Sequence, residues 1–433
     1  MLYSMNGDGT EFALWKWKAV RCNDKADGGI GMDNFWIIYK YEMKKLTGKK
    51  LLWGTAFLCM IAIVFTACAG LIGTYYVGGE AIESNYEAFR KDRIYRKNLS
   101  GRYIDEALLQ ETVDAYCHIP TDEPRYTLTE EYETFARPYS DIFNMIRAWT
   151  GMDFSSIQEW NLDEAALYEA REQQRESHWQ SLLLTETEKE FWRGMESQID
   201  TPLIYYYHEG YENLLNCFLT VGVLLLLFVA ICLSNLFADE HIRRTDQLVL
   251  SSRGGKESAY WAKILAGVTA SVVAATLMAI MTLVLNLVIY GAEGFEMPLQ
   301  CCLYVYSYPI TIGQACIIAY GILIVASILA AVFVMVISEL FRSGIVALAI
   351  STGLIILGNL VLIPAEYRVL AQMWDWTPMA YLAPWNIFDA RTLTVFGQCF
   401  ASWQTVPIIY ILLSVILAVG GKYIYQRYQV SGR

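Results

Sequence analysis

The sequence predicts an all-α membrane protein with six transmembrane helices and an inserted, mainly helical domain. Two observations predict this fold class: 55% of the residues are hydrophobic, and six long apolar stretches carry no Asp, Glu, Lys or Arg near their middles. A helix needs roughly 20 residues to cross the hydrocarbon core of a bilayer, and a single segment satisfies its backbone polar groups there only as a helix. We therefore expect transmembrane helices over residues 51–77, 213–237, 264–290, 309–337, 344–364 and 405–426.

The segment between the first two expected spans, residues 78–212, has the composition of a water-exposed domain. It holds 28 acidic and 13 basic residues, and it is long enough to bury a core of its own. Thr185 and Glu188 have the spacing of a capping box that begins a helix. The pattern fits a solvated helical stalk or a ligand-binding domain, whose core could be formed by Trp149, Trp160, Trp179 and Trp192.

Positive charges are concentrated in the short loops on one side of the expected spans. Such loops set the orientation of a membrane protein, because segments rich in Lys and Arg stay on the cytoplasmic side. Residues 40–50 hold five lysines and residues 238–263 hold five basic side chains, whereas residues 291–308 hold none. We expect a protein of the plasma membrane with both termini in the cytoplasm, including a tail at 427–433, and with the acidic domain outside.

The sequence predicts no catalytic, nucleotide or metal site on this chain. Gly254–Lys256 is the nearest match to a phosphate-binding loop, but it lacks the first glycine and the hydroxyl that would hold magnesium. The four histidines are scattered, no Gly-x-Ser-x-Gly elbow occurs, and no cysteine pair has zinc-ligand spacing. No basic face suits nucleic acid. No charged residue lies deep in a span, which argues against an ion-driven transporter.

The loop after the second expected span carries a pattern that suits a docking element. Glu240 and Arg244 are four residues apart, so they would face each other on a helix. Leu248, Val249 and Leu250 form a short apolar run among charged residues. A short helix with an apolar tip can dock into a groove of a cytosolic partner. An ordinary loop whose charges only set the topology fits the same composition.

This loop resembles the corresponding loop in permease subunits of ABC-2 type exporters. Those permeases share a Phe-x-x-Glu near the end of the second helix, a Leu-Leu/Val-Leu-Ser segment followed by an arginine, and an alanine–lysine pair that enters the third helix. The resemblance covers residues 32–428 and extends to a subgroup with a large extracellular domain between the first two helices. The matching positions are Phe237, Glu240, Leu248–Ser251, Arg253, Ala262 and Lys263.

The resemblance implies a division of labour between two kinds of subunit. This chain would provide the path through the membrane, and a separate ABC ATPase would bind ATP and Mg²⁺, in agreement with the missing phosphate loop. The permease would pair with a second copy of itself or with a similar permease. The residues that couple it to the ATPase would be Glu240, Arg244, Leu248, Val249, Leu250, Arg253 and Lys263 in the loop 238–263.

The resemblance also implies roles for two further segments. Residues 32–50 would form a cytoplasmic interfacial helix, and their own pattern supports this, because Trp36, Tyr39 and Met43 fall on one helical face. Residues 365–404 would be extracellular and would dip back into the outer leaflet, or else lie along the membrane surface. Residues 1–31 do not fit a signal peptide, and we expect them to be disordered or an over-extended start.

A non-transporting membrane receptor is the alternative function from another class. The acidic domain would then be the sensor, and the basic loop would contact an effector. The excess of acidic residues in that domain fits the capture of a cationic external molecule, although keeping the domain soluble is the simpler explanation.

Overall fold

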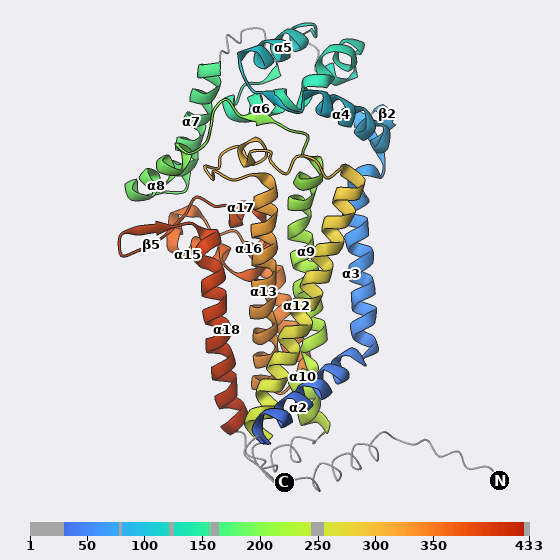
Figure 1. Ribbon diagram of the computed structural model, residues 1–433, viewed down its shortest axis with the longest axis vertical. Coiled ribbons are helices and arrows are strands. Elements are labelled where there is room, and N and C mark those ends of the chain that lie inside the picture. Colours follow the sequence, from blue (N-terminus) through green and yellow to red (C-terminus); the bar gives the residue numbers. More distant parts are fainter. Residues whose placement is uncertain are drawn as a thin grey trace, which may run out of the picture.

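The computed structural model shows a bundle of long helices with a smaller helical domain stacked on one end (Figure 1). The structure describes residues 30–77, 80–120, 125–154, 156, 164–243 and 255–427. We call the end that carries the inserted domain the domain side, and the opposite end the base. The base holds α2 (Ile30–Thr47) and the end of α18 (Ser402–Arg427). The predicted all-α membrane fold is confirmed.

Among the described residues, five helical spans are long and apolar enough to cross a membrane. Four of them agree closely with the predicted stretches, and the second continues beyond its helix into α10 (Asn235–Arg243). The helices that make up the five spans are α3 (Lys50–Cys68), α9 (Glu209–Leu233), α12 (Gly255–Tyr290), α13 (Ile312–Phe341) and α18.

The stretch predicted as the fifth span, residues 344–364, is a shorter helix followed by a sharp bend. The helix α14 (Gly344–Leu360) ends four residues before Pro364, and that proline disfavours helical backbone at the residue before it. The chain then turns by 119° into η7 (Ala365–Tyr367) and α15 (Arg368–Asp375). The sixth candidate span is therefore this bent pair rather than one straight helix.

The first span is also shorter than the predicted residues 51–77. The helix α3 ends at Cys68, and η1 (Ala69–Leu71) adds one tight turn. Gly73 then adopts a φ of +115°, which a residue with a side chain rarely adopts. Beyond it the chain forms an antiparallel hairpin of β1 (Thr74–Val77) and β2 (Glu80–Ser84).

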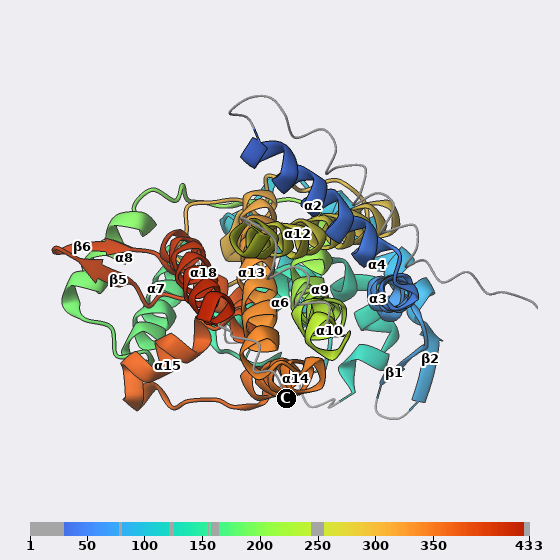
Figure 2. The ribbon, with the colours of Figure 1, turned by 90° about the horizontal axis from the view of Figure 1, so that it is seen from below.

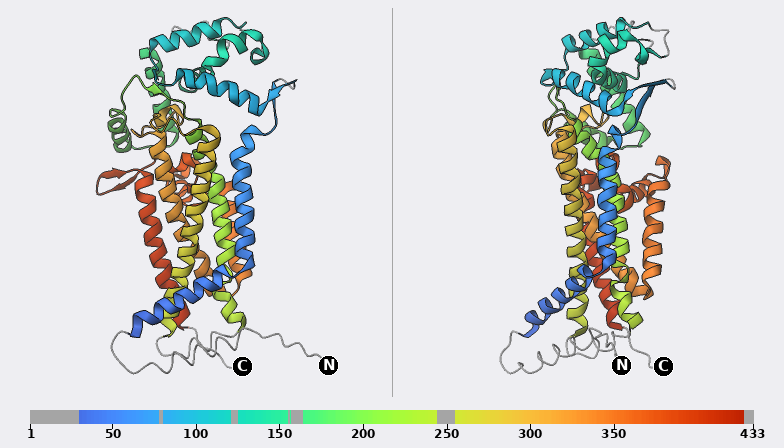
Figure 3. Two further views of the ribbon diagram at one scale, coloured as in Figure 1. Left: turned by 45° about the vertical axis from the view of Figure 1, so that its right-hand side comes forward. Right: turned by 90° about the vertical axis from the view of Figure 1, so that its right-hand side faces the viewer.

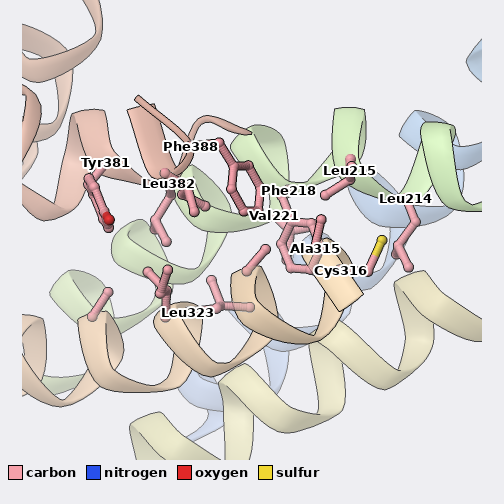
Figure 4. Packing of buried hydrophobic residues seen from close by; sticks show 14 of the residues in the cluster. Leu214, Leu215, Phe218, Val221, Ala315, Cys316, Leu323, Tyr381, Leu382 and Phe388 are labelled. Carbon is pink, nitrogen blue, oxygen red and sulfur yellow. The ribbon is translucent and has the colours of Figure 1, made fainter. Parts of the chain in front are cut away.

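The helix α13 lies at the centre of the bundle and packs against α9, α12, α14 and α18. Figure 4 shows the side chains of α9 and α13 in contact, among them Phe218 and Val221 opposite Ala315 and Leu323. Lipid tails are as apolar as these side chains, so packing inside a membrane depends on close van der Waals contact. The helices α12 and α13 approach closely at Gly267 of α12, because Met335 of α13 occupies the space that a Cβ on this residue would need.

The described part of the inserted domain is mainly helical and buries large aromatic side chains. Trp149, Trp179 and Trp192 are each 1% exposed, as a core requires, whereas Trp160 lies outside the described residues. The predicted capping box of Thr185 and Glu188 is present. The elements are α4 (Asn85–Leu99), β3 (Arg102–Tyr103), α5 (Glu106–Cys117), η2 (Tyr126–Leu128), η3 (Tyr132–Ala136), η4 (Arg137–Tyr139), α6 (Ser140–Thr150), α7 (Glu164–Ser181), α8 (Glu186–Glu196) and β4 (Ile204–Tyr205), which pairs antiparallel with β3.

The chain between α15 and α18 is folded into short elements on the domain side. It contains α16 (Pro378–Tyr381), α17 (Pro384–Ile387) and an antiparallel hairpin of β5 (Leu393–Val395) and β6 (Gln398–Phe400). The hairpin projects away from the bundle beside the beginning of α18 (Figure 1). The loop after α12 contains one tight turn, η6 (Leu299–Cys301).

Candidate functional site

Three helices meet at the base around one buried lysine. The Nζ of Lys263, on α12, lies 2.9 Å from Oε1 of Glu42 on α2, and it also pairs with Glu240 on α10. Lys263 is 1% exposed, Glu42 5% and Glu240 9%. Removing one member of a buried ion pair typically costs about 3–5 kcal/mol, because the remaining charge stays buried without compensation. The cluster therefore fixes α2, α10 and α12 to one another.

A second set of contacts strengthens the connection between α2 and α10. Lys45 reaches Oε1 of Glu240 at 3.5 Å and Oε2 of Glu42 at 3.7 Å. Lys49, in the turn after α2, donates to Asp239 at 2.8 Å. The cluster therefore contains three lysines and three carboxylates, and its charges balance. Two of the lysines, Lys45 and Lys49, come from α2 and the turn after it, so this segment supplies most of the positive charge.

Aromatic side chains attach α18 to the same region. Phe237, Tyr260 and Tyr425 have ring centroids 5.5–5.9 Å apart, and the Tyr260 hydroxyl donates to the carbonyl of Ala418 at 2.6 Å. The Nζ of Lys263 lies 5.8 Å from the centroid of the Phe237 ring. Phe237 is the phenylalanine of the Phe-x-x-Glu motif, so this motif places one residue in the aromatic contact and one in the ion-pair cluster.

The structure places only part of the predicted coupling set. Glu240 and Lys263 are brought together, although the sequence analysis gave them no contact with each other. Because Lys263 is buried, its ammonium group cannot lie on a surface offered to another chain; it can act only by holding Glu240 and Glu42. The remaining predicted coupling residues lie outside the described residues: Arg244, Leu248, Val249, Leu250 and Arg253.

The helix α2, predicted to be interfacial, crosses the base next to α12 (Figure 2). The Tyr39 hydroxyl donates to Oγ1 of Thr269 on α12 at 3.2 Å, and Met43 packs against the core. Trp36 is 49% exposed and contacts the ring of Tyr39 at its edge. Glu42 lies next to these packed residues on the helix and is itself buried. A lone acid within an apolar face was the sequence signal for the cluster, and it was missed.

On the domain side, the segment after α15 inserts between the bundle helices. Leu382 packs against Gly222 near the middle of α9, where an added Cβ would lie 2.6 Å from a Leu382 methyl carbon. The Tyr410 hydroxyl of α18 donates to the carbonyl of Trp376 at 2.7 Å. Figure 4 shows Tyr381, Leu382 and Phe388 among the side chains of α9 and α13. This part of the predicted re-entrant segment 365–404 thus packs within the bundle rather than over it.

The inserted domain is attached to that segment through the first turn of α8. The carboxylate of Glu188, 1% exposed, accepts hydrogen bonds from the Thr392 amide at 3.1 Å and the Thr392 hydroxyl at 2.9 Å, and it pairs with Arg368. Burial alone would raise the pKa of Glu188, but hydrogen bonds from Thr185, Arg368 and Thr392 outweigh it and hold the pKa below its usual value. The Trp192 indole donates to the carbonyl of Ala390 at 2.6 Å.

Two cavities lie on the domain side. One of about 400 Å³ is lined by residues of α5 and α7, including Glu106 and Tyr168. A second, of about 160 Å³, lies where the inserted domain meets the start of α9 and is lined by Arg96, Asp141 and Glu212 among others. No group of three or more His, Cys, Asp or Glu side chains within the described ranges is arranged to hold a metal ion.

Comparison with known families identifies the class of membrane protein. A family model described as ABC-2 family transporter protein matches residues 56–388. The chain belongs to the ABC-2 transporter family. The match runs from α3 to Phe388, before the β5–β6 hairpin, and it confirms the predicted resemblance to ABC-2 permeases but not the predicted subgroup. This ABC-2 chain is therefore a membrane permease of an ABC transporter. No curated protein matches it.

Proposed function

We propose that this ABC-2 permease is the membrane-spanning subunit of an ATP-driven exporter, and that a separate ATPase chain docks on the loop between α10 and α12. The permease itself would have no catalytic role, and ATP and Mg²⁺ would bind on the partner. The observation that carries this proposal is the buried cluster of Lys263, Glu240 and Glu42. It joins the helix before that loop and the helix after it to the interfacial helix α2.

The cluster supports a mechanical route from the ATPase to the spans. Movement of the docked ATPase would displace the loop and hence the two helix ends that border it, Arg243 of α10 and Gly255 of α12. Because the ion pairs hold α2, α10 and α12 together, these helices would move as one unit rather than separately. In this route Arg244, Leu248, Val249, Leu250 and Arg253 contact the ATPase. Glu240 and Lys263 are positioning residues behind that surface.

The proposal also sets the orientation in the membrane. The base would face the cytoplasm and the inserted domain would be extracellular, because Lys40, Lys44 and Lys50 add exposed positive charge at the base. Both chain termini would then be cytoplasmic, in the plasma membrane. A second copy of this permease, or a similar permease, would complete the transport path.

The decisive experiment is purification of the permease from native membranes with its interacting chains, followed by transport assays in proteoliposomes. We expect an ATPase with a phosphate-binding loop to copurify, and transport to require both chains and ATP. Pumping by the purified permease without a companion chain would contradict the proposal. No feature of the described residues favours the alternative of a non-transporting receptor.

A further inference from the structure

The cavity of about 160 Å³ on the domain side lies where three parts of the chain meet. Its lining comes from α4 and α6 of the inserted domain, from the start of α9, and from the loop between α12 and α13. Figure 3 shows the inserted domain above the domain-side ends of the long helices in both views. A molecule in this cavity would therefore touch the inserted domain and the start of a span at the same time.

His208, just before α9, brings an acceptor nitrogen to this cavity. The side chain is 7% exposed and forms part of the lining. Its Nδ1 lies 2.7 Å from the carbonyl oxygen of Tyr206, so Nδ1 carries the proton and Nε2 of the neutral ring is an acceptor. Among the described residues, Nε2 pairs with Oε2 of Glu212 at 3.6 Å, which is too long for a hydrogen bond. Two neighbouring acceptors thus lack a hydrogen-bond donor.

The charges around the cavity favour a cation. Arg96 supplies the guanidinium in the lining, and it is already paired with Asp141 at 2.8 Å and with Glu209 at 3.3 Å. Together with Glu212, three carboxylates surround one guanidinium, which gives a net charge of −2 while His208 is neutral. The beginning of α9 contributes only about +0.5 of an elementary charge, so the negative charge prevails.

The lining also limits the size and the kind of cation. An engineered cavity of about 150 Å³ in another protein holds benzene, so a group of about six heavy atoms fits here. Met145 and Met297 supply buried apolar surface, and Tyr304 adds an aromatic ring, which attracts a cation over its face. Within the described ranges, no three His, Cys, Asp or Glu side chains are arranged to hold a metal ion. The cation is therefore a molecular one.

We propose that this cavity binds a primary ammonium group on a short alkyl chain. The ammonium group has three N–H donors, and it donates to Nε2 of His208 and to the carboxylate of Glu212. The alkyl chain lies against Met145 and Met297. A free small amine and the lysine side chain of a peptide share this chemistry. The proposal requires the described fold but neither the ATPase nor a direction of transport.

The test is a titration of the purified permease in detergent with n-butylammonium chloride, followed by saturation-transfer difference NMR at constant ionic strength. Butyrate and 1-butanol are the anionic and neutral probes of similar size. We expect saturable binding of n-butylammonium and no saturable binding of the other two. Equal binding of all three probes would overturn the proposal, and so would the lack of saturable binding by n-butylammonium.

Glu212→Gln and a matched control locate the site. Removing the charged acceptor should weaken n-butylammonium binding about tenfold. Glu111→Gln is the control, because the Glu111 side chain is also 44% exposed, pairs with Arg102 in the inserted domain and lies outside the lining. Its affinity for n-butylammonium should be unchanged. Equal affinities in the two variants would show that the ammonium group does not bind at Glu212.

Asn144→Trp blocks the cavity without touching its charges. Asn144 is exposed on α6 and belongs to the lining, so the variant should fold and the indole should fill the entrance. We expect binding of n-butylammonium to be lost while thermal stability is kept. Unaltered binding would overturn the proposed location.

A second probe, N-acetyl-lysine methylamide, distinguishes the two sources of the ammonium group. Binding tighter than that of n-butylammonium indicates the lysine of a peptide, since the added backbone atoms then make contacts of their own. Binding of n-butylammonium alone indicates a free amine. Both results support the ammonium site, whereas binding of neither probe would overturn it.

Discussion

Glu42 and Lys263 lie 2.9 Å apart and are both buried, although 221 residues separate them in the sequence. The contact joins the helix α2 to the helix α12, and Glu240 of α10 completes it from the other side. In the proposed mechanism, these ion pairs would connect the loop on which the ATPase docks to the spans.

We expect Lys263→Met to destabilise the protein by about 3 kcal/mol, the lower end of the range for removing one member of a buried ion pair, because Glu42 and Glu240 stay buried together with only Lys45, at 3.5–3.7 Å, to compensate their charge. Thermal unfolding of the purified permease in detergent measures the loss. Lys422→Met is the matched control, since Lys422 forms a solvent-exposed pair with Glu257 between α18 and α12 at 2.6 Å. Such a surface pair is worth only about 0–1 kcal/mol. Equal losses of stability in the two variants would show that the buried cluster stabilises the protein no more than an exposed ion pair does.

Gly222→Ala should weaken the packing of the segment after α15, which contains Leu382, against the bundle. The added Cβ would lie 2.6 Å from Leu382, so Leu382 must move, at a cost of about 1–3 kcal/mol for an overpacked core. Gly353→Ala on α14 is the control, because no atom lies within 4 Å of the added Cβ. Thermal stability should fall in the first variant and be unchanged or slightly higher in the second. Unchanged stability of Gly222→Ala would mean that Leu382 does not pack tightly there.

The contacts of Glu188 on α8 with Arg368 and Thr392 should be stable at neutral pH and weaken only in acid. The pKa of Glu188 is lowered in the folded protein, so its ionised form contributes stability above the unfolded value of about 4.3 and loses it as the pH falls through the lower folded value. Hydrogen exchange at Thr392 and Ala390, followed from pH 7 to pH 3, measures the release. In Glu188→Gln we expect faster exchange at neutral pH and no acid-dependent step. Release already between pH 7 and pH 5 would contradict the assignment.

Cysteine labelling tests the proposed orientation. Cys117 is exposed in the inserted domain, and it is the one exposed thiol among the described cysteines. A membrane-impermeant maleimide should therefore label it in intact cells, and Cys117→Ser should abolish most of the labelling. Labelling only after the cells are opened would place the inserted domain in the cytoplasm and reverse the proposed topology.

Local patterns and long apolar runs made much of the fold predictable from the sequence. The capping box of Thr185 and Glu188 was correct because its members are three residues apart and need no tertiary context. The spans were found because a long apolar run is enough to indicate one. Two predicted spans were too long, because α3 ends at Cys68 and α14 ends at Leu360, each inside apolar sequence.

Contacts between distant segments could not be derived in the same way. Glu188 also binds Arg368 and Thr392, which are 180 and 204 residues away, and no pattern near α8 indicates this second role. Similarly, Glu240 and Lys263 were singled out by their motif, but Glu42 was not. As a lone acid on an apolar helical face, Glu42 was recognisable, but its partners depend on where α2 crosses α10 and α12, which only the packed structure determines.

The central claim is that the buried cluster couples the ATPase to the spans, and Glu240→Gln tests it most directly. The amide keeps a hydrogen bond to Lys263 while removing the charge, so membrane insertion and ATPase binding should persist. We expect transport-coupled ATPase activity of the reconstituted complex to fall several-fold in Glu240→Gln, and to be unchanged in Glu257→Gln, which alters only the exposed pair with Lys422. Normal coupling in Glu240→Gln would contradict the claim.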